Sequence, residues 1–235
     1  ALGDWQPPDS APGRKTIAQV APPEQPIIYL LDKPGAPQSM VIGGQLIPPT
    51  PAADSLHLDM ATRILGGNFN ARLNMNLRED KGWAYGARLT ATNARGQRPL
   101  LYYAPVQIDK TTAALQEIIR EAQDYLGPRP ATREELHRTR EGILRSLPGR
   151  FETNTAVRRT LVDILRFDRP LDYIDRYQAN LETLTLDQVK QAAQTHLTPP
   201  KTLWLIVGDL TKIEKPLRDS KIAEVKVLTP HEKTP

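Results

Sequence analysis

The chain has 235 residues, 39% of them hydrophobic, which is enough for a sizeable core in one large domain or two small ones. Its 31 basic and 27 acidic residues leave a net charge of +4, a small excess that argues against a nucleic-acid-binding protein. The absence of cysteine excludes disulfides, thiolate metal sites and a cysteine nucleophile, and no apolar run is long enough to predict a membrane span.

Proline divides the chain into regions. Prolines are concentrated before residue 52, and residues 1–25 predict an extended proline-rich linker from a preceding domain. We expect one folded domain over residues 26–213, followed by a partly ordered tail over residues 214–235.

Within this domain, hydrophobic periodicity and turn residues predict alternating pairs of strands and helices. Two helices begin with capping boxes, formed by Thr132 with Glu135 and by Thr185 with Gln188. The order predicts an α+β fold, with a mostly antiparallel sheet and helices packed on one face. The predicted elements are strands at 27–32 and 38–47, helices at 52–65 and 71–80, strands at 82–92 and 100–108, helices at 111–126, 132–147, 155–167 and 185–197, and a buried strand at 202–210.

The chain carries none of the common local motifs for metal or nucleotide binding. Its four histidines include no H-E-x-x-H or H-x-x-E-H pair, so we predict no metal site in this chain. Gly66, Gly67 and Asn68 begin a "GGNFN" run that lacks the remaining residues of a phosphate-binding loop. A glycine pair there predicts a helix break, where another backbone or an extended ligand approaches closely.

Three further features leave alternatives open. Arg78 falls in a last helical turn, where a cation suits the helix dipole, and it could be an ordinary surface residue. Tyr85 follows Trp83 by two residues, so the two rings could form an aromatic packing pair on one side of a strand. The arginine-rich run 149–170 is interrupted by acidic residues, which favours a solvated surface, with a basic wall for an acidic peptide or partner subunit as the alternative.

A longer sequence pattern helps to choose between these alternatives. Residues 65–87, "LGGNFNARLNMNLREDKGWAYGA", resemble a segment of the pitrilysin/insulinase family of zinc metallopeptidases, in the C-terminal half of the two-domain unit of bacterial processing-peptidase-like members. The matching pattern is a glycine pair, then Arg-Leu, Leu-Arg-Glu and Gly-x-Ala-Tyr. Supporting segments such as "DKPGAPQS" and "WLIVGDL" extend the resemblance over residues 24–213.

The resemblance implies that the two halves of the enzyme have different roles. One half carries H-x-x-E-H and a distant glutamate, which bind zinc, and the other contributes an Arg and a Tyr seven residues apart. By resemblance, Arg78 and Tyr85 bind the substrate carbonyl and stabilise the oxyanion, and Gly66, Gly67 and Asn68 contact substrate.

The family relation also predicts partners. Zinc is expected on a partner domain or subunit, substrates are expected to be unfolded peptides, and the chain alone is expected to be inactive. The resemblance leaves open whether the zinc-bearing half belongs to the same polypeptide. A periplasmic location is expected, with the cytoplasm as the alternative. The competing function is a catalytically inactive binding or scaffold module of the same family.

Overall fold

A computed structural model describes residues 4, 6, 13 and 15–229. Over these residues the chain forms one six-stranded sheet with the strand order β3-β4-β2-β5-β1-β6. The strands are β1 (Ile27–Asp32), β2 (Gln38–Ile47), β3 (Arg88–Ala91), β4 (Arg98–Gln107), β5 (Leu203–Gly208) and β6 (Glu224–Leu228). The helices are α1 (Ser55–Thr62), α2 (Arg72–Asn74), α3 (Thr111–Leu126), α4 (Arg133–Ser146), α5 (Asn154–Arg166), α6 (Tyr173–Thr183), α7 (Leu186–His196) and α8 (Leu210–Asp219).

Shorter helical segments join these elements. Two are π-helical, η1 (Arg63–Gly67) and η2 (Met75–Asp80), and continue α1 and α2 respectively. Three are 3₁₀ turns, η3 (Ile108–Lys110), η4 (Pro148–Phe151) and η5 (Pro199–Lys201). Among the described residues, no helix is both long enough and apolar enough to cross a membrane.

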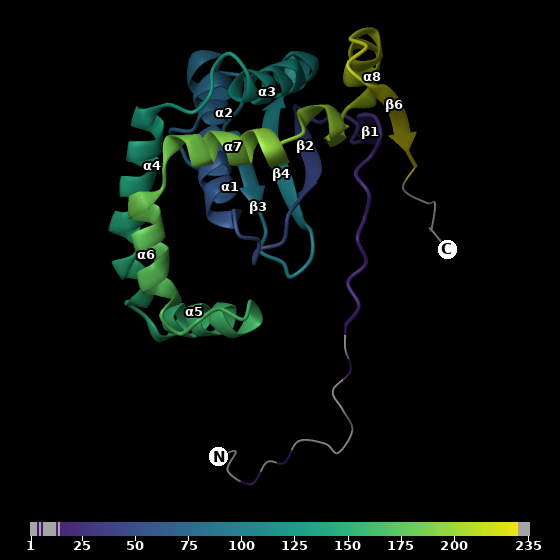
Figure 1. The fold of residues 1–235 in the computed structure, drawn as a ribbon. Coiled ribbons are helices and arrows are strands. Elements are labelled where there is room, and N and C mark those ends of the chain that lie inside the picture. Colours follow the sequence, from purple (N-terminus) through teal and green to yellow (C-terminus); the bar gives the residue numbers. More distant parts are fainter. Residues whose placement is uncertain (1–3, 5, 7–12, 14, 230–235) are drawn as a thin grey trace.

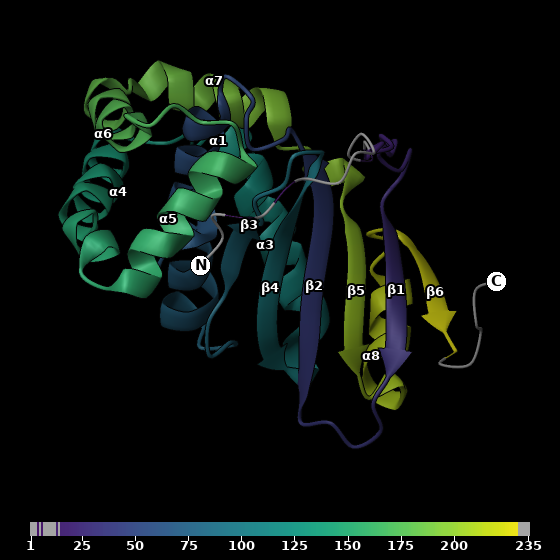
Figure 2. The same ribbon diagram turned by 90° about the horizontal axis from the view of Figure 1, so that it is seen from below.

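The sheet is mostly antiparallel, as predicted. Strand β2 pairs antiparallel with both β4 and β5, and β3 pairs antiparallel with β4. Strand β1 is the exception, because it lies between β5 and β6 and runs parallel to both. Although β1 and β2 follow each other in the chain, β5 therefore separates them in the sheet (Figure 2).

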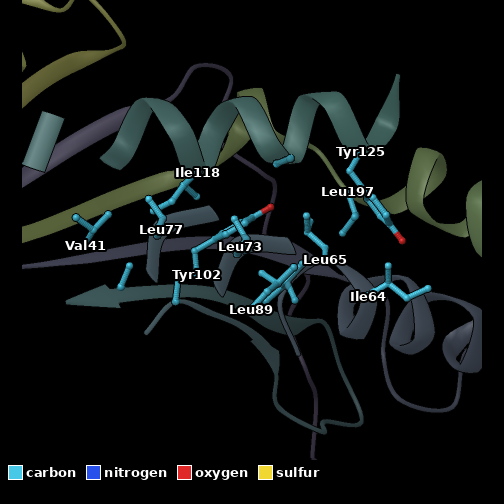
Figure 3. Packing of buried hydrophobic residues seen from close by; sticks show 14 of the residues in the cluster. Val41, Ile64, Leu65, Leu73, Leu77, Leu89, Tyr102, Ile118, Tyr125 and Leu197 are labelled. Atoms are coloured by element: carbon cyan, nitrogen blue, oxygen red, sulfur yellow. The ribbon is translucent and has the colours of Figure 1, made fainter. Parts of the chain in front are cut away.

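The core lies between the sheet and the helices behind it. Side chains of β2 alternate between buried and half-buried, as expected of a sheet with one covered face. In Figure 2, α3 and α8 lie behind the sheet, and the described helices leave the front of β2, β5 and β1 uncovered. Figure 3 shows the packing beneath α3, where Leu73 and Leu77 meet Tyr102 and Ile118.

Helices α4, α5 and α6 extend to one side of the sheet. In Figure 1, α4 and α6 run downward together, and α5 lies across their lower end, on the side of the sheet opposite α3. We call residues 148–183, from η4 to α6, the arm. Both predicted capping boxes are present, at the starts of α4 and α7.

Two sequence-based boundaries differ from the structure. The strand predicted over residues 82–92 is limited to β3, because the chain first forms a turn at Gly82, where φ is +64°, and then only one isolated bridge, between Ala84 and Val106. At the other end, α8 spans residue 213, and β6 adds an edge strand beyond it. Regular structure therefore continues through much of the predicted tail, because Ile213 and Leu217 are buried and β6 pairs with β1.

Candidate functional site

A cavity of about 690 Å³ lies between the arm, the π-helical segments and β3. It contains all five residues that the sequence analysis selected, namely Gly66, Gly67, Asn68, Arg78 and Tyr85. Residues from the arm complete the lining, among them Arg150, Asp163, Arg169, Tyr173 and Tyr177.

Segment η2 places Arg78 in the lining of this cavity. Leu77 is fully buried, and the amide of Asn76 donates to Glu117 (3.1 Å) and Glu121 (2.9 Å) on α3. These contacts anchor η2 to α3. Arg78 follows directly and remains partly exposed, with Glu79 3.3 Å from its Nε.

A second arginine in the same motif has a structural role. The guanidinium of Arg72 forms a bidentate pair with Glu135, at 2.6 and 2.7 Å, and stacks 5.0 Å from the ring centre of Tyr125. Arg72 therefore ties α2 to the start of α4. Arg72 is not among the residues that line the cavity.

The turn after η2 returns the chain toward Arg78. The carbonyl of Leu77 accepts hydrogen bonds from the backbone N–H groups of Trp83 (2.9 Å) and Ala84 (3.2 Å). Gly82 makes this turn possible, because its positive φ is a conformation that few other residues adopt without strain. The same turn starts the segment that carries Tyr85.

The structure brings Arg78 and Tyr85 together. The guanidinium carbon of Arg78 lies 5.5 Å from the ring centre of Tyr85 and 4.5 Å from that of Phe69. Tyr85 is 82% exposed, which a packing pair with Trp83 would not allow, and Trp83 instead has the ammonium of Lys81 5.0 Å from its ring centre. The exposed hydroxyl-bearing ring of Tyr85 and the guanidinium of Arg78 thus offer two hydrogen-bond donor groups on one side of the cavity.

Asn74 fixes the segments on either side of this pair, although the sequence analysis did not select it. Its side-chain amide donates to the carbonyl of Phe69 (2.7 Å) and accepts from the N–H of Ala87 (3.0 Å). The residue is only 4% exposed. Asn74 therefore links the loop that stacks on Arg78 to the segment that carries Tyr85.

The glycine pair is a point of close approach. A Cβ on Gly66 would lie 2.6 Å from Cβ of Leu89 and 2.8 Å from its backbone nitrogen, so η1 packs directly against β3. Gly67 and Asn68 are exposed beside it in the cavity lining. The predicted close approach is thus made by the backbone of β3 at Gly66, while a ligand could reach the next two residues.

The described residues do not offer a metal site. They contain no group of three or more His, Asp or Glu side chains placed to hold an ion. His196 is instead 2.5 Å from Asp54; burial raises the pKa of Asp54, but the hydrogen bond to His196 and the other interactions of this carboxyl together lower it, so that the net shift is downward. His231 lies outside the described residues.

Comparison with known proteins identifies the family that this chain matches. A family model described as the peptidase M16 inactive domain matches residues 1–143, more than half of the chain. None of the curated protein sequences matches.

Solved structures share the fold at low identity. A peptidase M16 inactive domain from Pseudomonas fluorescens is 24% identical with a TM-score of 0.77, and the match covers 85% of this chain and 47% of that one. The periplasmic protease PqqL from Escherichia coli is 17% identical (TM-score 0.65; 79% of this chain, 21% of that one). The inactive peptidase domain of a presumed zinc protease from Bordetella parapertussis is 20% identical (TM-score 0.61; 71% and 90%). The chain thus spans about half the length of the Pseudomonas protein.

Proposed function

Because this chain belongs to the peptidase M16 family, as an inactive domain without the zinc-binding motif, we propose that it is the half of a zinc endopeptidase that supplies Arg78 and Tyr85 to the reaction. The observation that carries the proposal is the pairing of these two side chains at the cavity, 5.5 Å apart as measured from guanidinium carbon to ring centre. The substrate would be an unfolded peptide, as the open cavity permits.

The residues of this chain act as hydrogen-bond donors. The phenolic O–H of Tyr85 and the guanidinium N–H groups of Arg78 would donate to the carbonyl oxygen of the scissile peptide bond and to the negative charge that develops there. The zinc of the partner half would supply the activated water. Because a guanidinium is a planar cation with several N–H donors, Arg78 can hold the neutral carbonyl as well as the oxyanion.

The partner is expected to be an H-x-x-E-H domain, on the same polypeptide or on a separate subunit. A periplasmic location is supported by the fold shared with PqqL, which is itself periplasmic. Purified chain should contain no stoichiometric zinc by elemental analysis and should cleave peptides only with the zinc-bearing half added. Chelator-sensitive cleavage by the chain alone would contradict this division.

The substitution Tyr85→Phe in the assembled enzyme tests the role of the hydroxyl. Because Tyr85 is 82% exposed, the stability of the fold should change by less than about 0.5 kcal/mol. Loss of one oxyanion donor should lower kcat by roughly 10²-fold to 10³-fold, with a much smaller change in KM. Arg78→Ala should impair both constants, since the guanidinium binds the ground state too.

A normal kcat for Tyr85→Phe would reverse the conclusion. Tyr85 would then be a surface aromatic, and the binding or scaffold module would become the better account of the chain. Trp83→Phe is the matched control, because Trp83 lies on the same turn but stacks with Lys81.

A further inference from the structure

The cavity has an excess of positive charge. Within the described residues, two of the lining arginines have ion pairs: Arg98 with Asp59 (3.0 Å) and Arg78 with Glu79 (3.3 Å). The other four arginines of the lining form no ion pair with any described residue; they are Arg63, Arg88, Arg150 and Arg169. The charged residues of the lining are Arg63, Arg78, Arg88, Arg98, Arg150 and Arg169, against Asp59 and Asp163.

Two of the uncompensated arginines lie on the arm and are held by aromatic rings. The guanidinium of Arg169 lies 4.0 Å from the ring centre of Tyr173 and 5.1 Å from that of Phe167, and Arg150 lies 5.8 Å from the ring centre of Tyr177. The rings of Tyr173 and Tyr177 are 5.9 Å apart, so these residues form one continuous strip. Stacking orients each guanidinium and leaves its N–H edge free for a carboxylate.

The charges along this strip act on one another. Burial raises the pKa of Tyr173, and the positive charges of Arg169 and Arg150 oppose that rise, whereas Asp59 adds to it. Both arginines are therefore close enough to influence the same hydroxyl. An anion bound beside Tyr173 would be attracted by the same two arginines, with Asp59 opposing them in part.

Arg98 provides an independent indication of a ligand. Its side chain is 1% exposed, its Nε donates to the carbonyl of Pro48 (2.8 Å) and its Nη1 donates to Asp59. Its buried Nη2 has no hydrogen-bond partner among the described residues, although Arg98 belongs to the cavity lining. A buried guanidinium nitrogen without an acceptor is costly, and an anion in the cavity would relieve that cost.

We propose that the cavity selects peptides with an acidic side chain, whose carboxylate is bound by Arg150 and Arg169 of the arm and approached by Nη2 of Arg98. The inference rests on the proposed function, because it defines the substrate class of that site. A single carboxylate fits better than a nucleic acid, because Asp59 and Asp163 line the same cavity and would repel a chain of phosphates.

Binding of labelled peptides to the full chain in zinc-free buffer tests the inference without requiring cleavage. Three unstructured peptides of equal length carry Glu, Gln or Lys at one central position, and fluorescence anisotropy measures Kd at low and at high salt. We expect the Glu peptide to bind about tenfold more tightly than the Gln peptide, as for a charge-assisted hydrogen bond. The preference should shrink as salt rises, because the strip is partly exposed.

Two double variants separate local contacts from general charge. Arg150→Gln with Arg169→Gln should reduce the Glu-to-Gln ratio to about one, chiefly by weakening binding of the Glu peptide. Arg158→Gln with Arg159→Gln removes the same charge from exposed positions of α5 outside the cavity lining, and should keep the ratio. Circular dichroism melting curves should be equal for the two double variants.

Three results would overturn the inference. They are equal affinity for the Glu and Gln peptides, an equal loss of preference in both double variants, and displacement of the Glu peptide by oligo-dT at lower concentration than by unlabelled Glu peptide. Cleavage assays of the assembled enzyme with both peptides are a separate readout. If neither peptide is cleaved, the proposed function fails, while the binding ratio still decides whether the cavity selects acidic peptides.

Discussion

Asn74→Ala should weaken the fold at the candidate site by a predictable amount. The substitution removes one acceptor and one donor, and the two groups that they serve differ in exposure. The N–H of Ala87 is buried, since that residue is 2% exposed, and losing its acceptor should cost about 1–3 kcal/mol. Phe69 is 58% exposed, so water can replace the lost donor at its carbonyl, and that loss should be about 1 kcal/mol.

The expected decrease in the free energy of unfolding is therefore about 2–4 kcal/mol. Urea titration followed by tryptophan fluorescence measures it, with an unchanged slope indicating that only stability differs. Asn68→Ala is the matched control. Asn68 is exposed and makes a single long hydrogen bond of 3.4 Å to the carbonyl of Arg63, so its loss should stay below about 0.5 kcal/mol.

A loss for Asn74→Ala no larger than for Asn68→Ala would refute the reasoning, because it would mean that the two segments are held in place by other contacts. The stability measurement does not depend on any enzymatic role. If Arg78 and Tyr85 act as proposed, kcat of the assembled enzyme should fall as well, since the segment that carries Tyr85 would lose its attachment.

Two further predictions concern stability. Gly66→Ala should lower the free energy of unfolding in urea by about 1–3 kcal/mol, because the new Cβ would lie 2.8 Å from the backbone nitrogen of Leu89. Gly142→Ala in α4 is the control, since its Cβ would have nothing within 4 Å, and it should raise that free energy by up to about 1 kcal/mol. Equal effects of the two substitutions would contradict the close approach at Gly66. Burial raises the pKa of Glu135, but hydrogen bonds from Arg72 and Thr132 and the charge of Arg72 together lower it more, so the folded-state pKa lies below the ordinary value of 4.5. The free energy of unfolding should therefore be higher for the wild type than for Glu135→Gln, with the full difference present above that value and lost as the pH falls through the lowered pKa. A difference in the free energy of unfolding that stays constant from pH 7 to pH 3 would argue against this.

Local sequence rules predicted the elements whose determinants are local. The capping boxes at Thr132 and Thr185 are formed because each hydroxyl needs only a backbone N–H three residues away. The position of β5 between β1 and β2 could not be predicted this way, since strand neighbours depend on contacts between distant segments. The sequence did not predict α8 for a related reason: it contains Pro216, which disfavours a helix, and its buried residues Ile213 and Leu217 pack against distant segments of the chain.

The candidate site was predictable only in part. Motif resemblance selected Arg78 and Tyr85, and the structure places them together. Arg98 was not selected, because nothing in its local sequence indicates that a strand-initial arginine is buried with an unpaired nitrogen. For the basic run, sequence alone favours a solvated surface over a basic wall for an acidic peptide or partner subunit, whereas the arm places Arg150 and Arg169 in the cavity lining and leaves Arg158 and Arg159 outside it.

The position of β1 between two late strands has a consequence for how the chain folds. Both neighbours of β1 come from residues 203–228, so β1 is synthesised well before either of the strands that pair with it. Such distant pairing is slow, because loop closure must precede any stabilising contact. Until then, both edges of this apolar strand are available to other chains, so the partly synthesised domain is exposed to aggregation.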